Sequence, residues 1–163
     1  MLALRYVALL ALVTWVGGLL ALGGIAAPVV FDVTAARHVA DSRVLAGALF
    51  GEMLRRFQPV SWTAGGVLLL TLIARAVLGP RPRRLAWRAA VATVMLAASL
   101  YAGLVVTTRM ERLQADIGGV APSSLAPDDA RRIEFGRLHG VASGLQLVPL
   151  LGGLLLMLWE MKE

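Results

Sequence analysis

The sequence of 163 residues contains no cysteine. This absence excludes disulfide bonds, a cysteine nucleophile, zinc ribbons, iron–sulfur clusters and copper sites built on thiolates. Charged residues are also scarce, at 16% of the chain, against about 25% in a typical soluble domain. Hydrophobic residues make up 58%, and the mean hydropathy is +0.76. The composition therefore argues against a soluble globular domain and against a disordered chain.

Four long apolar runs predict four transmembrane helices. A helix needs about 20 apolar residues to cross a hydrocarbon core of about 30 Å. The expected spans are about 6–28, 57–79, 88–108 and 138–159. Arg75 lies near the end of the second run, where we expect its guanidinium to snorkel to the headgroups. The sequence thus predicts one all-α membrane domain over residues 1–163, folded as a four-helix bundle.

The first run could be mistaken for a signal peptide with a cleavage region at Gly24–Ala27. The apolar part of a signal peptide has about 7–15 residues, and this run is longer. We therefore treat it as a span. The tryptophans at positions 15, 62, 87 and 159 mostly lie near the ends of the runs, which predicts that they anchor the helices at the interface.

Basic residues predict the orientation of the bundle. The loop 80–87, with Arg88 directly after it, holds four arginines and no acidic residue. Short loops rich in Lys and Arg stay in the cytoplasm, so we expect this loop and both termini on the cytoplasmic side of the inner (plasma) membrane. The outer segments, about 29–56 and 109–137, contain nine arginines but also eight acidic residues. The basic inner loop and the arginines near helix ends explain the net charge of +6, so no nucleic-acid partner is expected.

The outer segments are expected to form an amphipathic helical cap. Apolar side chains recur every four residues, at Leu45, Leu49, Met53 and Phe57. This spacing indicates an amphipathic helix over 43–57, which either lies on the membrane surface or covers a site. Pro59 is expected to end that helix or to kink it into the second span. Pro127 and the two aspartates after it predict the start of the fourth helix.

Polar residues on the fourth helix form the most informative candidate site. His139, Ser143 and Gln146 are spaced by four and three, so they share one helix face. Lipid cannot satisfy such side chains, so they are expected to face the bundle interior. There they either form interhelical hydrogen bonds or line a small polar cavity. Asp32, at the end of the first span, is expected to pair with Arg55, Arg56 or Arg137. The candidate ligand-binding residues are His139, Ser143, Gln146, Arg137, Asp32 and Arg56.

A transition metal is a second candidate ligand, because an imidazole nitrogen binds metals or haem and thioethers suit Cu(I). The candidate metal ligands, all expected on the outer side, are His139, His38, Met53 and Met110. No close pair such as His-x-x-x-His is present, and methionine commonly serves as a packing residue. A metal site is therefore the less favoured prediction.

Two stretches resemble a known family. The first contains Trp15–Gly18, Ala27–Phe31 and Ala46–Phe50, and the second contains Phe135–Gly140 with Ser143 one turn later. In this order they are similar to the bacterial branch of the transmembrane protein 205-like family, and the similarity covers nearly the whole chain. It implies a four-span fold, an activity that is not established, and a link to metal handling or export.

A fainter similarity runs to copper-resistance-D-like and membrane protoporphyrinogen-oxidase-like proteins, which implies a haem. The first span here has no histidine, so a pair of haem ligands within the bundle is not supported. Where the last span of relatives often has asparagine, this chain has Gln146.

Three functions follow from these patterns. The leading hypothesis is a non-enzymatic membrane protein that binds or transports a small solute or metal ion along the polar face of the last helix. The first alternative is a haem-linked or redox membrane protein. The second is a structural protein in the lipid bilayer that packs against a second copy or another membrane protein. Small residues suit such packing, at Gly17, Ala21, Gly24, Gly152 and Gly153.

Overall fold

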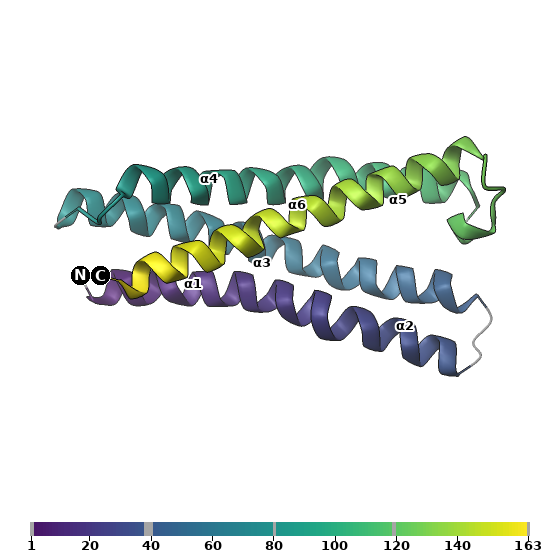
Figure 1. The fold of residues 1–163 in the computed structure, drawn as a ribbon, viewed down its shortest axis with the longest axis horizontal. Helices are drawn as coiled ribbons and strands as arrows, with labels where there is room; N and C mark the ends of the chain where they lie inside the picture. The colour runs from purple at the N-terminus through teal and green to yellow at the C-terminus, as the bar shows by residue number, and fades with distance from the viewer. Residues whose placement is uncertain (1, 38–40, 80, 119, 163) are drawn as a thin grey trace.

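The computed structural model describes residues 2–37, 41–79, 81–118 and 120–162, and regular structure in these ranges is entirely helical (Figure 1). The first rod joins α1 (Leu2–Ala21), the π-helical η1 (Leu22–Ala26) and α2 (Ala27–Ala36); the second is α3 (Ser42–Leu78). The third joins α4 (Leu85–Tyr101), the π-helical η2 (Ala102–Thr107) and α5 (Thr108–Asp116), and a 3-10 turn, η3 (Pro122–Ser124), precedes α6 (Ala130–Met161). Each rod is long and apolar enough to cross a membrane. The protein is therefore a multi-pass, all-α membrane protein with a four-helix bundle.

The outer segments are helical and extend the spans beyond the length that a membrane requires. The amphipathic segment expected at 43–57 is the first part of α3, which continues without interruption through Pro59. At about 1.5 Å per residue, the 37 residues of α3 reach about 55 Å, well beyond a hydrocarbon core. The fourth helix begins close to the expected position, because the Asp129 side chain accepts a hydrogen bond from the backbone N–H of Arg131.

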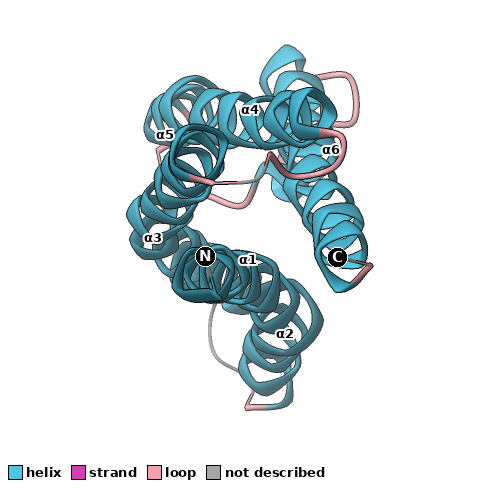
Figure 2. Ribbon diagram, turned by 90° about the vertical axis from the view of Figure 1, so that its left-hand side faces the viewer, coloured by secondary structure: helices cyan, strands magenta, loops and turns pink. Residues whose placement is uncertain are grey.

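The hydrophobic core occupies one half of the bundle. We call this the closed half: α1, residues 60–78 of α3, α4, and residues 148–161 of α6. Eleven of the fifteen buried hydrophobic residues in the described part lie here, and the largest fully buried side chains are Trp15, Leu12 and Met95. Both termini and the connection between α3 and α4 lie at the end of this half that is far from the rest of the bundle (Figure 1). Viewed from that end, the four rods surround a common centre (Figure 2).

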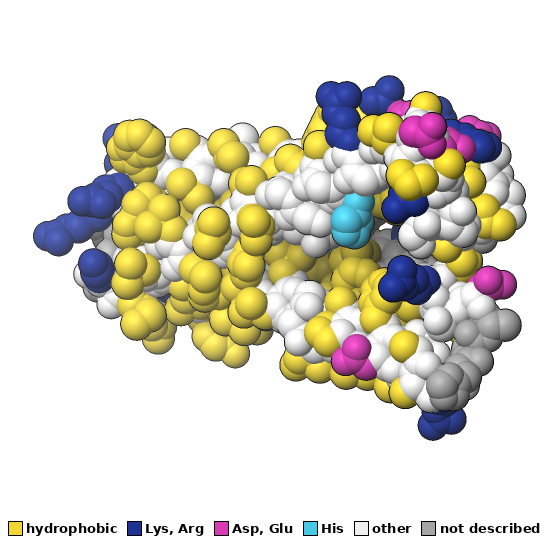
Figure 3. Space-filling view, turned by 45° about the vertical axis from the view of Figure 1, so that its right-hand side comes forward, with side chains coloured by type: hydrophobic (Ala, Val, Ile, Leu, Met, Phe, Trp, Pro, Cys, Tyr) yellow, Lys and Arg dark blue, Asp and Glu magenta, His cyan; other side chains and the backbone are white. Residues whose placement is uncertain are grey.

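The other half of the bundle is open. It comprises η1, α2, residues 42–59 of α3, η2, α5, η3 and residues 130–147 of α6. Here α2 packs against α3, and α5 packs against α6. Figure 3 shows the surface hollowed between these two pairs of helices. The two π-helical turns fall where the first and third rods enter this half, and such turns commonly accompany bends and functional sites.

Candidate functional site

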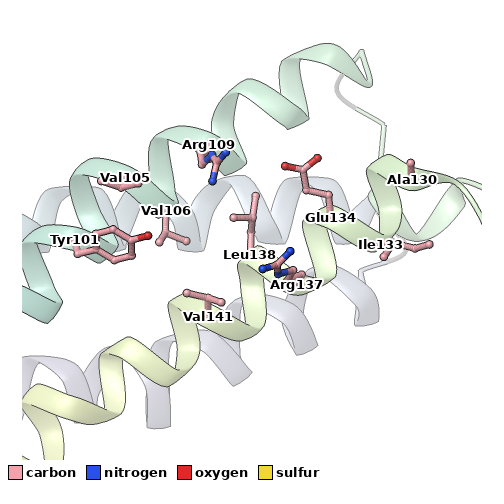
Figure 4. A pocket seen from close by; sticks show the side chains of 10 residues that line it. All are labelled: Tyr101, Val105, Val106, Arg109, Ala130, Ile133, Glu134, Arg137, Leu138 and Val141. Carbon is pink, nitrogen blue, oxygen red and sulfur yellow. The ribbon is translucent and has the colours of Figure 1, made fainter.

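A cavity of about 500 Å³ lies in the open half, between η2 and α5 on one side and α6 on the other. Its apolar wall is formed by residues on both sides, among them Tyr101, Val105, Val106, Leu138 and Val141. Its charged groups are Arg109, Glu134 and Arg137. Figure 4 shows these three side chains gathered around the space between the two helices. The cavity therefore combines an apolar wall with a charged rim, the usual make-up of a small-molecule site.

Local sequence places the charged rim at the outer ends of two apolar runs. Arg109 directly follows the third run, and Arg137 directly precedes the fourth. On α6, Glu134, Arg137 and Val141 are spaced by three and four, so they share one face. Of these charged residues, only Arg137 belongs to the predicted ligand-binding set. The position of Arg109 directly after a run, and of Glu134 one helical turn before the next run, is a signal that could have identified them.

The predicted polar face of α6 lies on a different side of the helix from this cavity. The His139 side chain is exposed and stacks with the ring of Phe135, at a centroid distance of 6.5 Å. Ser143 donates a hydrogen bond to the backbone carbonyl of His139 at 2.9 Å, and Gln146 is half-buried. None of these three residues lines the cavity.

The candidate metal ligands lie in the open half, apart from His38, which falls outside the described residues. Met53 is exposed on α3, and Met110 is half-buried on α5. Among the described residues, no three histidine, aspartate or glutamate side chains form a group that could hold a metal ion.

The carboxylate partner of Arg56 is Glu52, not Asp32. Both Arg55 and Arg56 contact the Glu52 carboxylate at 2.7 Å, one turn away on α3. Asp32 is exposed on α2 and forms no ion pair within the described ranges. Short spacing on one helix therefore outcompetes the longer-range pair that the sequence suggested.

Polar groups also gather in the middle of the bundle, where α3 meets η2. The Gln58 amide lies 3.4 Å from the Thr107 hydroxyl, and Gly103 leaves room for the side chains of Gln58 and Trp62. The indole N–H groups of Trp15 and Trp62 are buried without a hydrogen-bond acceptor among the described residues. Trp15 is 1% exposed, so the prediction that it anchors the helix at the interface is wrong.

A buried ion cluster ties the four rods together in the closed half. The Glu160 carboxylate of α6 accepts a hydrogen bond from Arg75 of α3 at 2.6 Å and another from Arg88 of α4. Arg5 of α1 lies 3.4 Å from the same carboxylate and also donates to the backbone carbonyl of Glu160. Arg88 donates to the backbone carbonyl of Trp159 as well. Each helical rod thus contributes one charged residue to this cluster.

The cluster corrects the expectation that Arg75 snorkels to the headgroups. Arg75 is 5% exposed and points into the bundle toward Glu160. Its sequence position near the end of an apolar run fits both arrangements, and the sequence did not single out Glu160. The carboxylate decides the outcome, because a buried arginine is tolerated when a charged partner faces it.

The small residues that were expected to pack against another protein differ in how closely the rest of the chain approaches them. A Cβ atom on Gly153 would lie 2.3 Å from Val16, and one on Gly152 would lie 2.8 Å from Met95, so these two glycines pack within the chain itself. A Cβ atom on Gly17 or Gly24 would meet nothing within 4 Å.

Comparison with known proteins gives one match. Residues 10–118, from α1 to the end of the third rod, match the model of a family described as a domain of unknown function, DUF4149. The helix α6, which carries Glu134, Arg137 and Glu160, lies beyond the matched residues. No curated protein and no solved structure matches the chain.

Proposed function

The chain belongs to the DUF4149 family, a family of unknown function, and on this premise we propose that it binds a small solute in the open half of its bundle. The observation that carries the proposal is the cavity between η2, α5 and α6. Its volume of about 500 Å³ falls within the range of about 300–1,000 Å³ that is typical of small-molecule sites. Its charged groups are few and lie at one rim, which suits the binding of a ligand in a fixed orientation.

The difference between the two halves supports access from one end. The buried side chains of Trp15, Leu12 and Met95 fill the closed half, and the Glu160 cluster lies beyond them. A solute therefore reaches the cavity from the open end or sideways from the lipid. Transport across the membrane would require a second conformation, in which the closed half separates.

The proposal includes an orientation. The closed half ends in an arginine-rich connection, with Arg81, Arg83 and Arg84, and basic loops face the cytoplasm. The proposed cavity then opens toward the outer side of the inner membrane, and both termini lie inside. The proposal also keeps the resemblance to the transmembrane protein 205-like family, and assigns His139 and Gln146 to the wall of the hollow on the opposite flank of α6.

A pair of tryptophan substitutions tests the proposal. Val141→Trp fills the apolar wall of the cavity, whereas Val94→Trp places the same side chain at an exposed position of α4 away from it. Native mass spectrometry of protein extracted from its own membranes in mild detergent shows which small molecules are retained. We expect wild type and Val94→Trp to retain the same bound molecule and Val141→Trp to lose it.

Equal retention by all three proteins would contradict the proposal, and so would a wild type that retains no molecule and binds none of the probes described below. His139→Ala and Gln146→Leu extend the same measurement to the polar face. Loss of the retained molecule in these variants would show that the polar face is part of the binding site. Full retention would show that it is not.

A further inference from the structure

We propose that the ligand of this cavity is an amphiphile with an anionic head, carboxylate or phosphate, and a single hydrocarbon chain. The head binds between Arg109 and Arg137, and the chain lies along the wall toward Tyr101 and Val141. This inference rests on the proposed function, because it names the class of solute that the cavity takes.

The charges at the rim select an anion. Within the described residues, neither Arg109 nor Arg137 forms a hydrogen bond or ion pair through its side chain. By contrast, Arg55 and Arg56 both pair with the Glu52 carboxylate, and Arg131 pairs with that of Asp129.

Two guanidinium groups and one carboxylate, that of Glu134, leave the rim with a charge of +1. A metal cation would be repelled by this rim. A carboxylate or phosphate would gain charge-assisted hydrogen bonds from two guanidinium groups.

The apolar wall selects a hydrocarbon chain. Tyr101 lies eight residues before Arg109 in the same rod, about 12 Å deeper in the membrane at 1.5 Å per residue. Tyr101 and Val141 are 52% and 41% exposed, so the wall is open to whatever lies beside it. A small water-soluble anion would contact only the rim. An alkyl chain attached to the anion covers the wall and stays in the hydrocarbon region, while its head remains at headgroup depth.

The first test compares four probes on the full-length protein in mild detergent by native mass spectrometry. Hexadecyl phosphate carries both features, hexadecyltrimethylammonium reverses the charge, hexadecanol removes it, and inorganic phosphate removes the chain. We expect a one-to-one complex with hexadecyl phosphate that forms at concentrations at least about tenfold lower than with any other probe. Equal binding of the cation or of hexadecanol would overturn the assignment of an anionic head, and equal binding of inorganic phosphate would overturn the assignment of a chain.

The second test changes the rim. Arg109→Gln and Arg137→Gln should each weaken hexadecyl phosphate binding by about tenfold, since each removes one charged donor. Glu134→Gln should keep or increase the affinity because it removes the negative charge. Arg112→Gln is the matched control, because Arg112 is an exposed arginine of α5 that does not line the cavity. Wild-type affinity in both Arg109→Gln and Arg137→Gln would overturn the inference.

The retained molecule separates this inference from the proposed function. If Val141→Trp removes the molecule that wild type retains, but hexadecyl phosphate does not displace that molecule, the cavity is a solute site for another class of ligand and only the inference fails. If wild type retains nothing and no probe binds, both fail.

Discussion

The two halves of the molecule use the same pairing, one glutamate with several arginines, in opposite ways. In the closed half, the Glu160 carboxylate meets arginines from three other rods, and its side chain is 5% exposed. In the open half, the Glu52 carboxylate meets two arginines from its own helix, and its side chain is 39% exposed. The first cluster joins elements that are far apart in sequence, whereas the second stays within two turns of α3.

This difference bears on the ligand site that we propose in the open half. Exposed pairs within one helix contribute little to stability, because water solvates both charges well. The Glu52 cluster therefore does not hold the helix pairs of the open half together. The closed half contains most of the buried apolar side chains and the ion cluster that joins all four rods. It acts as the fixed base from which the two helix pairs diverge.

The largest expected effect comes from removing the shared carboxylate. Glu160→Gln removes the negative charge that Arg75 of α3 and Arg88 of α4 both contact, and breaking a buried ion pair costs about 3–5 kcal/mol. Glu52→Gln is the matched control and should change the unfolding free energy little. Unfolding in mixed micelles with increasing dodecyl sulfate, followed by circular dichroism, measures both. Equal stability of the two variants would remove the distinction between the clusters.

A smaller effect is expected from substituting two glycines, Gly153, which is tightly packed, and Gly17, which has open space beside it. Gly153→Ala places a Cβ atom 2.3 Å from Val16, a stiff β-branched side chain between α1 and α6. Such overpacking typically costs about 1–3 kcal/mol. Gly17→Ala meets nothing within 4 Å, so the unfolding free energy should stay constant or rise slightly because alanine favours helix. The same unfolding assay measures both variants. A neutral Gly153→Ala would show that α1 and α6 separate easily.

The smallest effect is expected at the N-terminus of α6 in the open half. A hydrogen bond from the Arg131 side chain, assisted by the Arg131 backbone N–H, lowers the pKa of Asp129 from 3.8 to about 2. Because the folded pKa lies below the unfolded one, the cap stabilises the helix above pH 4 and loses this contribution as the pH falls toward 2.

Deuterium exchange in the first turn of α6, corrected for the intrinsic pH dependence of exchange, should therefore accelerate in wild type between pH 4 and pH 2. Asp129→Asn, which cannot titrate, should show no such step. A step of equal size in both proteins would assign the change to another group.

Much of the fold could be predicted because its determinants are local. Each apolar run is continuous in sequence, so the four helices and the start of α6 near Asp129 follow from length, periodicity and capping chemistry. Pro59 left two outcomes open, an end of the helix or a kink into the second span, and α3 continues through it. Proline removes one hydrogen bond and favours a kink, but it does not force the chain to leave the helix when the flanking residues continue it.

The parts that could not be predicted depend on distant residues. Glu160 lies 85 residues from Arg75 and 72 from Arg88, and no spacing rule connects positions so far apart. The same holds for the cavity, where Arg137 was a candidate but its partner across the space, Arg109, was not. Which side of a helix faces another rod is set by the packing of all four rods.

The ion cluster also has a consequence for the order in which the protein is made. Synthesis runs from the N-terminus, so Arg5, Arg75 and Arg88 are all added to the chain before Glu160. The ribosome adds about 5–20 residues each second, so the 72 residues after Arg88 take roughly 4–14 s. During that interval the nascent chain contains Arg5, Arg75 and Arg88 but lacks the Glu160 carboxylate, so the ion cluster cannot form. Synthesis of α6 is therefore the step that supplies the carboxylate joining the three earlier rods, and a chain that stops before Glu160 lacks the residue that ties these rods together.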